Sequence, residues 1–220
     1  MEHKFIPFSR KELTKEEQLG NSKLFFELMD ERRSVREFSD EPVAVEVIEN
    51  IIKTASTAPS GAHKQPWTFC VVTNPELKKQ IRAAAEREEK ENYATRMSDR
   101  WKEDLAPFGT DWEKPFIEKV PYIIVLFKRV HETIEGEKRN NYYVNESVGI
   151  AAGMLIAAIH NAGLSTLTHT PSPMNFLAQL LNRPENERAF LLLPVGHPQK
   201  NALVPDIQRK SLNEVMVCYK

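Results

Sequence analysis

The sequence is short of glycine and cysteine: its 220 residues include 8 glycines and 2 cysteines. The glycines form neither the dinucleotide motif G-x-G-x-x-G, nor the phosphate loop G-x-x-x-x-G-K, nor the nucleophile elbow G-x-S-x-G. Rossmann, P-loop and α/β-hydrolase chemistry are therefore excluded. Cys70 and Cys218 each lie in an apolar run without a C-x-x-C pair, which predicts reduced, buried thiols in a cytosolic protein.

Net charge and long apolar runs are also lacking. The formal net charge is -1, so nothing favours a nucleic-acid partner. The six histidines are scattered without ligand spacing, and no metal site is expected. The longest apolar stretch, 148–159, is too short to span a bilayer. We therefore expect a soluble, cytoplasmic protein without a membrane partner.

Hydrophobic periodicity predicts one α+β domain over residues 1–220. The helices are expected at 23–33, 45–55, 75–97, 143–161 and 173–181. The strands are expected at 67–73, 120–128, 164–169, 190–195 and 215–219. Residues 98–119 mix prolines, charges and tryptophans, which predicts a mobile covering loop.

A basic cluster follows the first predicted helix and comprises Arg32, Arg33, Ser34 and Arg36. Guanidinium groups match phosphate oxygens in charge and geometry, so the cluster is a candidate phosphate site. The alternative is that the arginines complement the helix dipole and stay solvated.

Two loops could present backbone amides to a ligand. Residues 57–67 combine small residues with Gly61, and 168–173 end a strand and open a helix. The alternatives are an ordinary turn before a strand and a plain helix cap at Ser172.

A possible binding site for a zwitterion involves Glu89, Tyr93 and Lys114. Glu89 and Tyr93 are four residues apart and share a helix face, and Lys114 lies beyond the expected loop. A carboxylate, a phenol and an ammonium could together hold an amino-acid head group. The alternative is a solvated helix surface, because charged residues surround Glu89.

Several segments, in this order, carry a family resemblance. They begin with R-R-S-V-R at 32–36, T-A-P-S-G-A-H-K-Q-P-W-T-F at 57–69 and E-x-x-x-Y-x-x-R-M-x-x-x-W at 89–101. N-A-G-L at 161–164, T-H-T-P at 168–171, L-L-P-V-G at 192–196 and V-P-D-I-Q-R-K at 204–210 follow. They resemble the nitroreductase superfamily of FMN proteins and, within it, the iodotyrosine deiodinases. The resemblance implies a central, mostly antiparallel sheet flanked by helices in an intertwined homodimer. Residues 86–119 would form an active-site lid, and residues 213–220 a strand that pairs with the partner subunit.

The resemblance implies FMN as the cofactor. Thr170 would place its hydroxyl by the flavin N5 nitrogen, which suits single-electron delivery. His169 differs from the hydroxyl residue of animal members. The residues implied at the cofactor are Arg32, Arg33, Ser34, Arg36, Pro59, Ser60, Gly61, Thr168, His169, Thr170 and Arg209.

The resemblance also implies a halotyrosine substrate. The Ala62 amide would meet its phenolate oxygen, in the manner of a small oxyanion site. Glu89 would bind its ammonium, and Lys114 and Tyr93 its carboxylate. Thr170 and Ala62 are the implied catalytic residues.

The implied activity is FMN-dependent reductive dehalogenation of halogenated tyrosines, with reduced FMN delivering electrons singly. NAD(P)H or a separate reductase would supply the electrons. The chain resembles a soluble, bacterial-type member, since the N-terminal membrane segment of the animal enzymes is not seen. Two alternatives stay open: a general NAD(P)H-dependent nitroreductase or flavin reductase, and a non-enzymatic flavin-binding dimer.

Overall fold

The computed structural model describes residues 4–220. The chain divides into a short N-terminal unit that ends at Arg32 and a main unit from Arg33 to Lys220. The main unit contains the sheet, all helices but the first, and the candidate site. The single domain expected over 1–220 stays a prediction.

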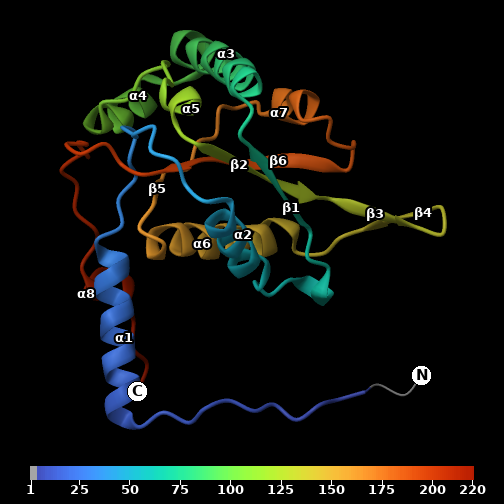
Figure 1. The fold of residues 1–220 in the computed structure, drawn as a ribbon, viewed down its shortest axis with the longest axis vertical. Coiled ribbons are helices and arrows are strands. Elements are labelled where there is room, and N and C mark those ends of the chain that lie inside the picture. The colour runs from blue at the N-terminus through green and yellow to red at the C-terminus, as the bar shows by residue number, and fades with distance from the viewer. Residues whose placement is uncertain (1–3) are drawn as a thin grey trace. The chain divides into compact units, whose positions relative to one another are not determined.

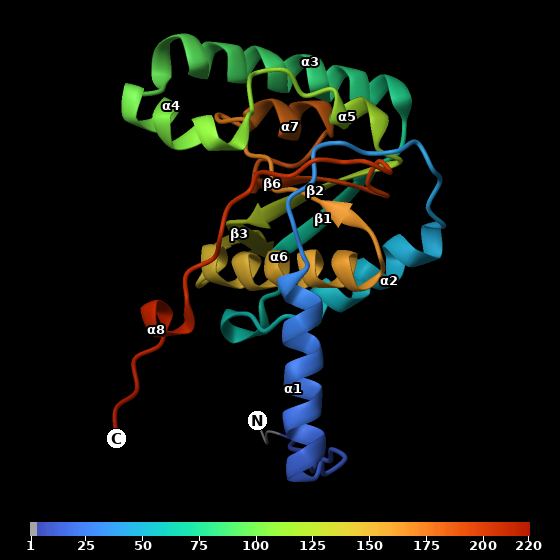
Figure 2. The same cartoon turned by 90° about the vertical axis from the view of Figure 1, so that its left-hand side faces the viewer.

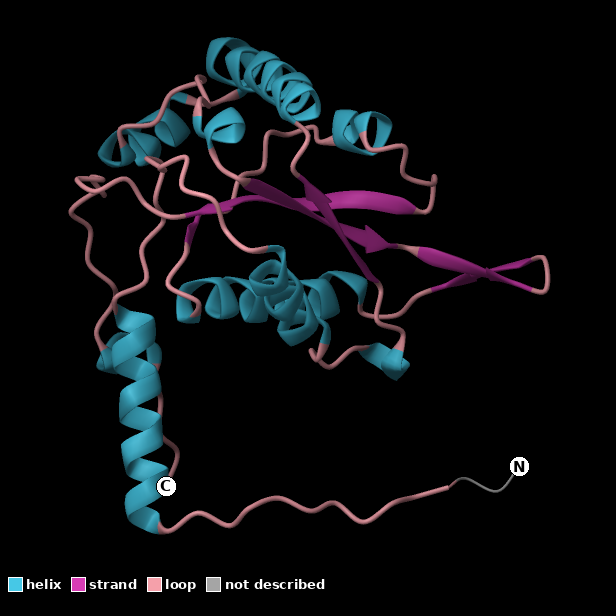
Figure 3. Cartoon of the chain, viewed as in Figure 1, coloured by secondary structure: helices cyan, strands magenta, loops and turns pink. Residues whose placement is uncertain are grey.

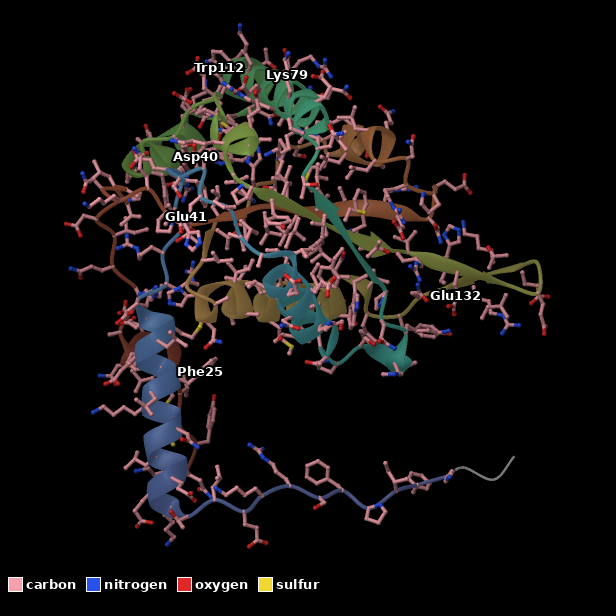
Figure 4. All side chains as sticks on the ribbon, in the orientation of Figure 1. Phe25, Asp40, Glu41, Lys79, Trp112 and Glu132 are labelled. Carbon is pink, nitrogen blue, oxygen red and sulfur yellow. The ribbon has the colours of Figure 1, made fainter. Side chains whose placement is uncertain are left out.

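The N-terminal unit is built around α1 (Lys15–Asp30). Thr14 Oγ1 accepts the Glu17 N–H at 3.1 Å, and the Glu17 carboxylate accepts the Thr14 N–H at 2.8 Å. This capping box starts the helix eight residues before the predicted position. Leu24 and Phe25, two apolar residues of this helix, are exposed in this unit, and Figure 4 labels Phe25 on the helix.

A four-stranded antiparallel sheet crosses the main unit in the order β1-β2-β6-β5, as Figures 1 and 3 show. Val125 of β2 pairs with Cys70 on one side and Leu192 on the other. The predicted antiparallel sheet is confirmed. The strands are β1 (Trp67–Val72), β2 (Tyr122–Arg129), β5 (Ser165–Thr166) and β6 (Glu187–Gly196).

Helices cover both faces of this sheet, which gives three layers (Figures 1 and 2). One face carries α3 (Pro75–Glu91), α4 (Asp99–Leu105), α5 (Phe116–Lys119) and α7 (Asn175–Leu180). The other face carries α2 (Val45–Ser56) and α6 (Val144–Asn161). A π-helical turn, Asn92–Arg96, continues α3, and α8 (Leu212–Val215) lies near the C-terminus.

Strand β2 shows why the sheet needs both layers. Successive side chains of a strand point to opposite faces. Val125 and Phe127 pack into the core under α3, α5 and α7, whereas Ile124 and Leu126 pack against α2 and α6. The continuous apolar run predicted this strand because both of its faces are buried.

Helix α6 buries one side and exposes the other. Leu155 and Ile159 pack in the core, but Gly149, Ile150 and Gly153 on the opposite side are exposed. The apolar composition of α6 predicts that the helix is buried on most sides. A single chain buries only one side of it. Neither α6 nor any other helix in residues 4–220 combines the length and apolarity needed to cross a membrane.

The prediction of a mobile loop at 98–119 is wrong, because this segment contains α4 and α5. Ser98 Oγ accepts the Trp101 N–H at 3.2 Å and so caps α4. Phe116 and Ile117 are buried in the core on the α3 side. This segment is therefore anchored at its C-terminal end by apolar packing.

The predictions for the C-terminal residues also need correction. Residues 215–219 form no strand within the single chain, since α8 ends at Val215 and the residues after it are exposed. Cys218 is exposed, and Cys70 is half-buried, with burial raising the pKa of its thiol. The pairing of 213–220 with a partner subunit stays a prediction. The predicted strand at 164–169 shortens to β5, with His169 forming an isolated bridge to Leu192.

A buried carboxylate in β6 provides a test of the fold. Glu187 accepts hydrogen bonds from Arg183 at 2.7 Å and Thr68 at 2.6 Å, and Arg129 lies 3.5 Å away. Burial acts to raise the pKa of Glu187, but these partners outweigh it and the net pKa is lowered. We expect Glu187→Gln to reduce the free energy of unfolding by about 2 kcal/mol at pH 7.

The sign of the pH dependence follows from the lowered pKa. The stabilisation by Glu187 is present above the unfolded-state pKa and disappears as pH falls through the folded-state pKa. Urea denaturation at neutral and acid pH measures it, with the exposed Glu185→Gln as matched control. Equal stability of the two variants at pH 7 would contradict the prediction.

Candidate active site

One cavity of about 260 Å³ opens on the α3 side of the sheet. Its walls come from α3 and its π-helical continuation, from α4, from the segment before α5, and from the segment after β5. Residues that are far apart in the sequence therefore meet at one place. Seven predicted site residues line it: Arg36, Glu89, Tyr93, Lys114, Thr168, His169 and Thr170.

Glu89 reaches the cavity from α3, and Tyr93 from its π-helical continuation. The helix begins at Asn74, whose side chain accepts the Leu77 N–H at 3.0 Å, and the spacing of four residues places both side chains on the cavity side. Glu89 is only 9% exposed, so the alternative of a solvated helix surface is wrong at this position. The Tyr93 hydroxyl donates a hydrogen bond to the Thr110 carbonyl at 3.0 Å.

Lys114 enters the cavity from the turn that precedes α5. Its side chain is buried, although it carries a long ammonium-bearing stem. The Nζ atom donates to the Asp111 carbonyl and lies 3.4 Å from the Thr110 hydroxyl. The turn thus holds the ammonium close to Tyr93, which contacts the same residue, Thr110. We call Glu89, Tyr93 and Lys114 the polar cluster.

The charges of the polar cluster are incompletely compensated. Within residues 4–220, Glu89 and Lys114 form no direct ion pair. Burial raises the pKa of Glu89, and the charge of Lys114 opposes this only in part. Burial likewise lowers the pKa of Lys114, against the charges of Glu89 and Asp111. A ligand with a cation and an anion would give each buried charge a partner.

The opposite wall consists of Thr168, His169 and Thr170. Side chains alternate along this extended segment, so Leu167 and His169 are buried whereas Thr168 and Thr170 are exposed and line the cavity. The backbone N–H and C=O of His169 pair with Leu192 at 2.9 and 3.0 Å. Two hydroxyl groups are therefore held on the sheet edge, available to a ligand.

His169 itself is a neutral, buried group. Burial, together with the nearby Lys114 and Arg36 charges, lowers its pKa to about 3. Its ring packs edge-on against Phe116, with centroids 5.8 Å apart. Its Nε2 atom has no hydrogen-bond partner within residues 4–220. An unsatisfied nitrogen beside two free hydroxyls is consistent with a polar heterocyclic ligand at this wall.

The basic cluster is only partly at the cavity. Arg36 lines it, and burial lowers the pKa of this guanidinium. Ser34 lies next to β5 through its bridge to Thr166. Arg33 donates to the Pro205 carbonyl, and Arg209 is exposed; neither lines the cavity. Arg32 belongs to the N-terminal unit.

The loop 59–62 lies away from the cavity. It follows α2 and contacts α6, which cover the other face of the sheet; the Gly61 N–H donates to Ser147 Oγ at 3.2 Å. Pro59, Ser60, Gly61 and Ala62 are therefore not brought together with the polar cluster within one chain. None of them lines the cavity.

This loop nevertheless has a defined and strained conformation. A Cβ on Gly61 would lie 3.0 Å from the Tyr142 carbonyl oxygen, so a side chain there would press on the segment that precedes α6. Ala62 adopts a positive φ of 49°, which is costly for a residue with a Cβ. Just beyond, Lys64 pairs with Glu132 of the hairpin β3 (His131–Ile134) and β4 (Glu137–Asn140) (Figure 4). The surroundings thus fix the Ala62 amide on the exposed surface.

Two contacts to α3 escaped the sequence analysis. Asn92 is buried and donates to the Ser172 carbonyl at 2.9 Å, which joins α3 to the loop after Thr170. Trp112, beside α3 in Figure 4, has the Lys90 ammonium 5.1 Å from its ring centre. Asn92 lies three residues after Glu89 and therefore on the same helix face. That spacing is the sequence signal that could have identified Asn92.

The fold and this cavity define a member of the nitroreductase family, and the chain belongs to it: the model of the Nitroreductase family matches residues 29–197. The chain is 60% identical over 216 residues to the iodotyrosine deiodinase of Haliscomenobacter hydrossis, covering 98% of this chain and 97% of that protein. It is 48% identical over 214 residues to human iodotyrosine deiodinase 1, covering 96% and 74% of the two chains.

A solved structure gives the same picture. The chain resembles the crystal structure of oxidised iodotyrosine deiodinase bound to FMN and 3-iodo-L-tyrosine, with a TM-score of 0.78 and 33% sequence identity. The similarity covers 89% of this chain and 98% of that chain.

Proposed function

We propose that this protein is an FMN-dependent iodotyrosine deiodinase, which removes halide reductively from halogenated tyrosines. The observation that carries the proposal is the single cavity in which the polar cluster faces Thr168 and Thr170. In the reaction the aryl carbon–halogen bond breaks, two electrons and one proton replace the halogen, and the halide leaves as an anion. The names of the relatives, at up to 60% identity, support the assignment.

The polar cluster binds the amino-acid head of the substrate. The Glu89 carboxylate accepts hydrogen bonds from the substrate ammonium, and Lys114 Nζ and the Tyr93 hydroxyl donate to its carboxylate. Both donors already contact the turn 110–111, so they are positioned before substrate arrives. Before binding, the buried charges of Glu89 and Lys114 lack full compensation. The substrate gives each of them a partner in a site from which water is excluded.

The wall at Thr168–Thr170 is where FMN fits, together with Arg36. Free hydroxyls, an unsatisfied imidazole nitrogen and a guanidinium suit the polar edge of a flavin and its phosphate. Bound FMN supplies the two electrons, one at a time. Thr170 would hold its hydroxyl toward the flavin ring. The residues proposed near the ribityl chain and phosphate are Arg33, Ser34 and Arg209.

A second copy of the chain completes the site. The cavity of about 260 Å³ is smaller than the roughly 300–1,000 Å³ of typical ligand sites, so it accommodates the head group rather than a halotyrosine with a flavin. Loop 59–62 lies on the far face of its own sheet, and α6 exposes Gly149, Ile150 and Gly153 beside it. In a homodimer joined through this face, loop 59–62 of one subunit would line the flavin site of the other, and its Ala62 amide would donate to the phenolate.

The proposal is tested by iodide release. The FMN-loaded protein, reduced without oxygen, should release one iodide per 3-iodotyrosine, measured by an iodide-selective electrode. A general nitroreductase would reduce a nitroaromatic with NAD(P)H and release no iodide, and a flavin-binding dimer without enzyme activity would do neither. Absence of iodide from the fully reduced protein would contradict the proposal. Parallel runs with NAD(P)H or a separate reductase identify the electron source.

A further inference from the structure

Glu86 joins the substrate lysine to helix α3. The backbone N–H of Lys114 donates to Glu86 Oε1 at 2.7 Å, across 28 residues of sequence. The same oxygen accepts a hydrogen bond from Arg82 Nε at 2.6 Å. Arg82 also donates to Glu118 of α5 at 3.1 Å. These contacts attach both ends of the segment 114–118 to one helix.

Glu86 belongs to the helix face that carries the polar cluster. Arg82, Glu86, Glu89 and Tyr93 follow one another at intervals of four, three and four residues, so they form one stripe along α3 and its continuation. The N-terminal half of the stripe holds the backbone of Lys114. The C-terminal half contacts the ligand site. One rigid helix therefore sets the positions of all three members of the polar cluster.

An ordinary surface ion pair does not explain this arrangement. An exposed pair at i and i+4 contributes little, and it needs no third partner. Glu86 is partly buried, with 18% of its side chain exposed, and its oxygen accepts a distant backbone donor as well as Arg82. Without that oxygen the Lys114 N–H would lose its hydrogen-bond acceptor in a place that water reaches poorly. The turn that carries Lys114 would then shift until the N–H found another acceptor.

We propose that Glu86 is a positioning residue for substrate binding: by fixing the Lys114 backbone on α3, it places the Lys114 ammonium where the substrate carboxylate binds. The inference rests on the proposed function. Glu86 acts through an acceptor oxygen, which glutamine also has, and through no contact with the flavin. Its role is therefore confined to ligands that carry the carboxylate.

The test compares Glu86→Ala, which removes the acceptor, with Glu86→Gln, which keeps it. The matched control is Glu91→Ala, since Glu91 is an exposed carboxylate of α3 bonded only to its neighbour Thr95. For each FMN-loaded protein, flavin fluorescence gives the dissociation constants of 3-iodotyrosine and of its methyl ester, which lacks the anionic carboxylate. FMN affinity and the kcat and KM of iodide release are also measured.

We expect Glu86→Ala to weaken 3-iodotyrosine binding about tenfold and to raise KM with kcat retained. The dissociation constants of Glu86→Gln and Glu91→Ala for 3-iodotyrosine should lie within about twofold of the wild-type value. All the proteins should bind the methyl ester with the same affinity. Unchanged binding by Glu86→Ala, or an equal loss for ester and free acid, would overturn the inference. Failure of the wild type to bind 3-iodotyrosine would instead overturn the proposed function.

Discussion

Replacing Glu89 by glutamine should weaken 3-iodotyrosine binding by about a hundredfold while leaving the protein at least as stable as wild type. The substrate ammonium loses the carboxylate that faces it in the cavity, in a place shielded from water. Burial raises the pKa of Glu89, so its ionised form costs folding free energy at neutral pH, and glutamine removes that cost. Flavin fluorescence titration and thermal unfolding measure the two effects.

The pH dependence of Glu89 gives a second check on the same residue. Because its folded-state pKa is raised, protonation stabilises the folded state, and this contribution is lost as pH rises through that pKa. The stability advantage of Glu89→Gln should therefore be largest at neutral pH and shrink in acid. Wild-type affinity should fall over the same acid range. A variant that binds normally, or one that is less stable at pH 7, would contradict the assignment.

Two inactive variants should restore activity when they share a dimer. Lys114→Met removes the carboxylate donor of the cavity, and Gly61→Val displaces the loop that presents the Ala62 amide, because its side chain meets the Tyr142 backbone. In the proposed dimer each site takes Lys114 from one subunit and loop 59–62 from the other. A mixed dimer therefore contains one intact site and one site with both defects.

Equal co-expression of the two variants should give about a quarter of wild-type activity, since half the dimers are mixed and each has one working site. Each variant alone should release almost no iodide, while retaining a cooperative thermal transition. If Gly61→Val does not fold, Ser147→Ala, which removes the acceptor of the Gly61 N–H, takes its place. Recovery no greater than the mean of the two variants would show that one chain supplies the whole site.

Elements with a strong local pattern could be predicted from the sequence. Helix α2 begins and ends within one residue of its predicted bounds, and Ile48, Ile51 and Ala55 are buried as its periodicity indicates. Strand β2 was evident because both of its faces are covered. In each case neighbouring residues alone determine which side is apolar.

Capping residues and distant packing partners were harder to recognise. The Ser98 cap starts a helix that the apolar pattern does not show, and the Thr14 box starts α1 eight residues before the helix that the pattern predicts. Phe116 and Ile117 were assigned to a covering loop because prolines and charges surround them, although the core under α3 buries both. Residues 215–219 have a strand-like composition, but a single chain provides no strand for them to pair with.

The polar cluster illustrates the limit for the site. On sequence alone Glu89 and Tyr93 fit a solvated helix surface, and nothing local relates them to Lys114. Their arrangement depends on Glu86, which contacts Lys114 across 28 residues of sequence, and on Thr110, which contacts Tyr93 across 17. Family resemblance supplied these residues, and the cavity brings them together.

A crystal structure of the FMN-loaded protein with 3-iodotyrosine is the most direct test of this account. It should show the ligand ammonium on Glu89, its carboxylate on Lys114 and Tyr93, and its phenolate on the Ala62 N–H of a second subunit, with the ring stacked on the flavin. A ligand whose head group points into solvent, or whose ring binds away from Thr170, would contradict it.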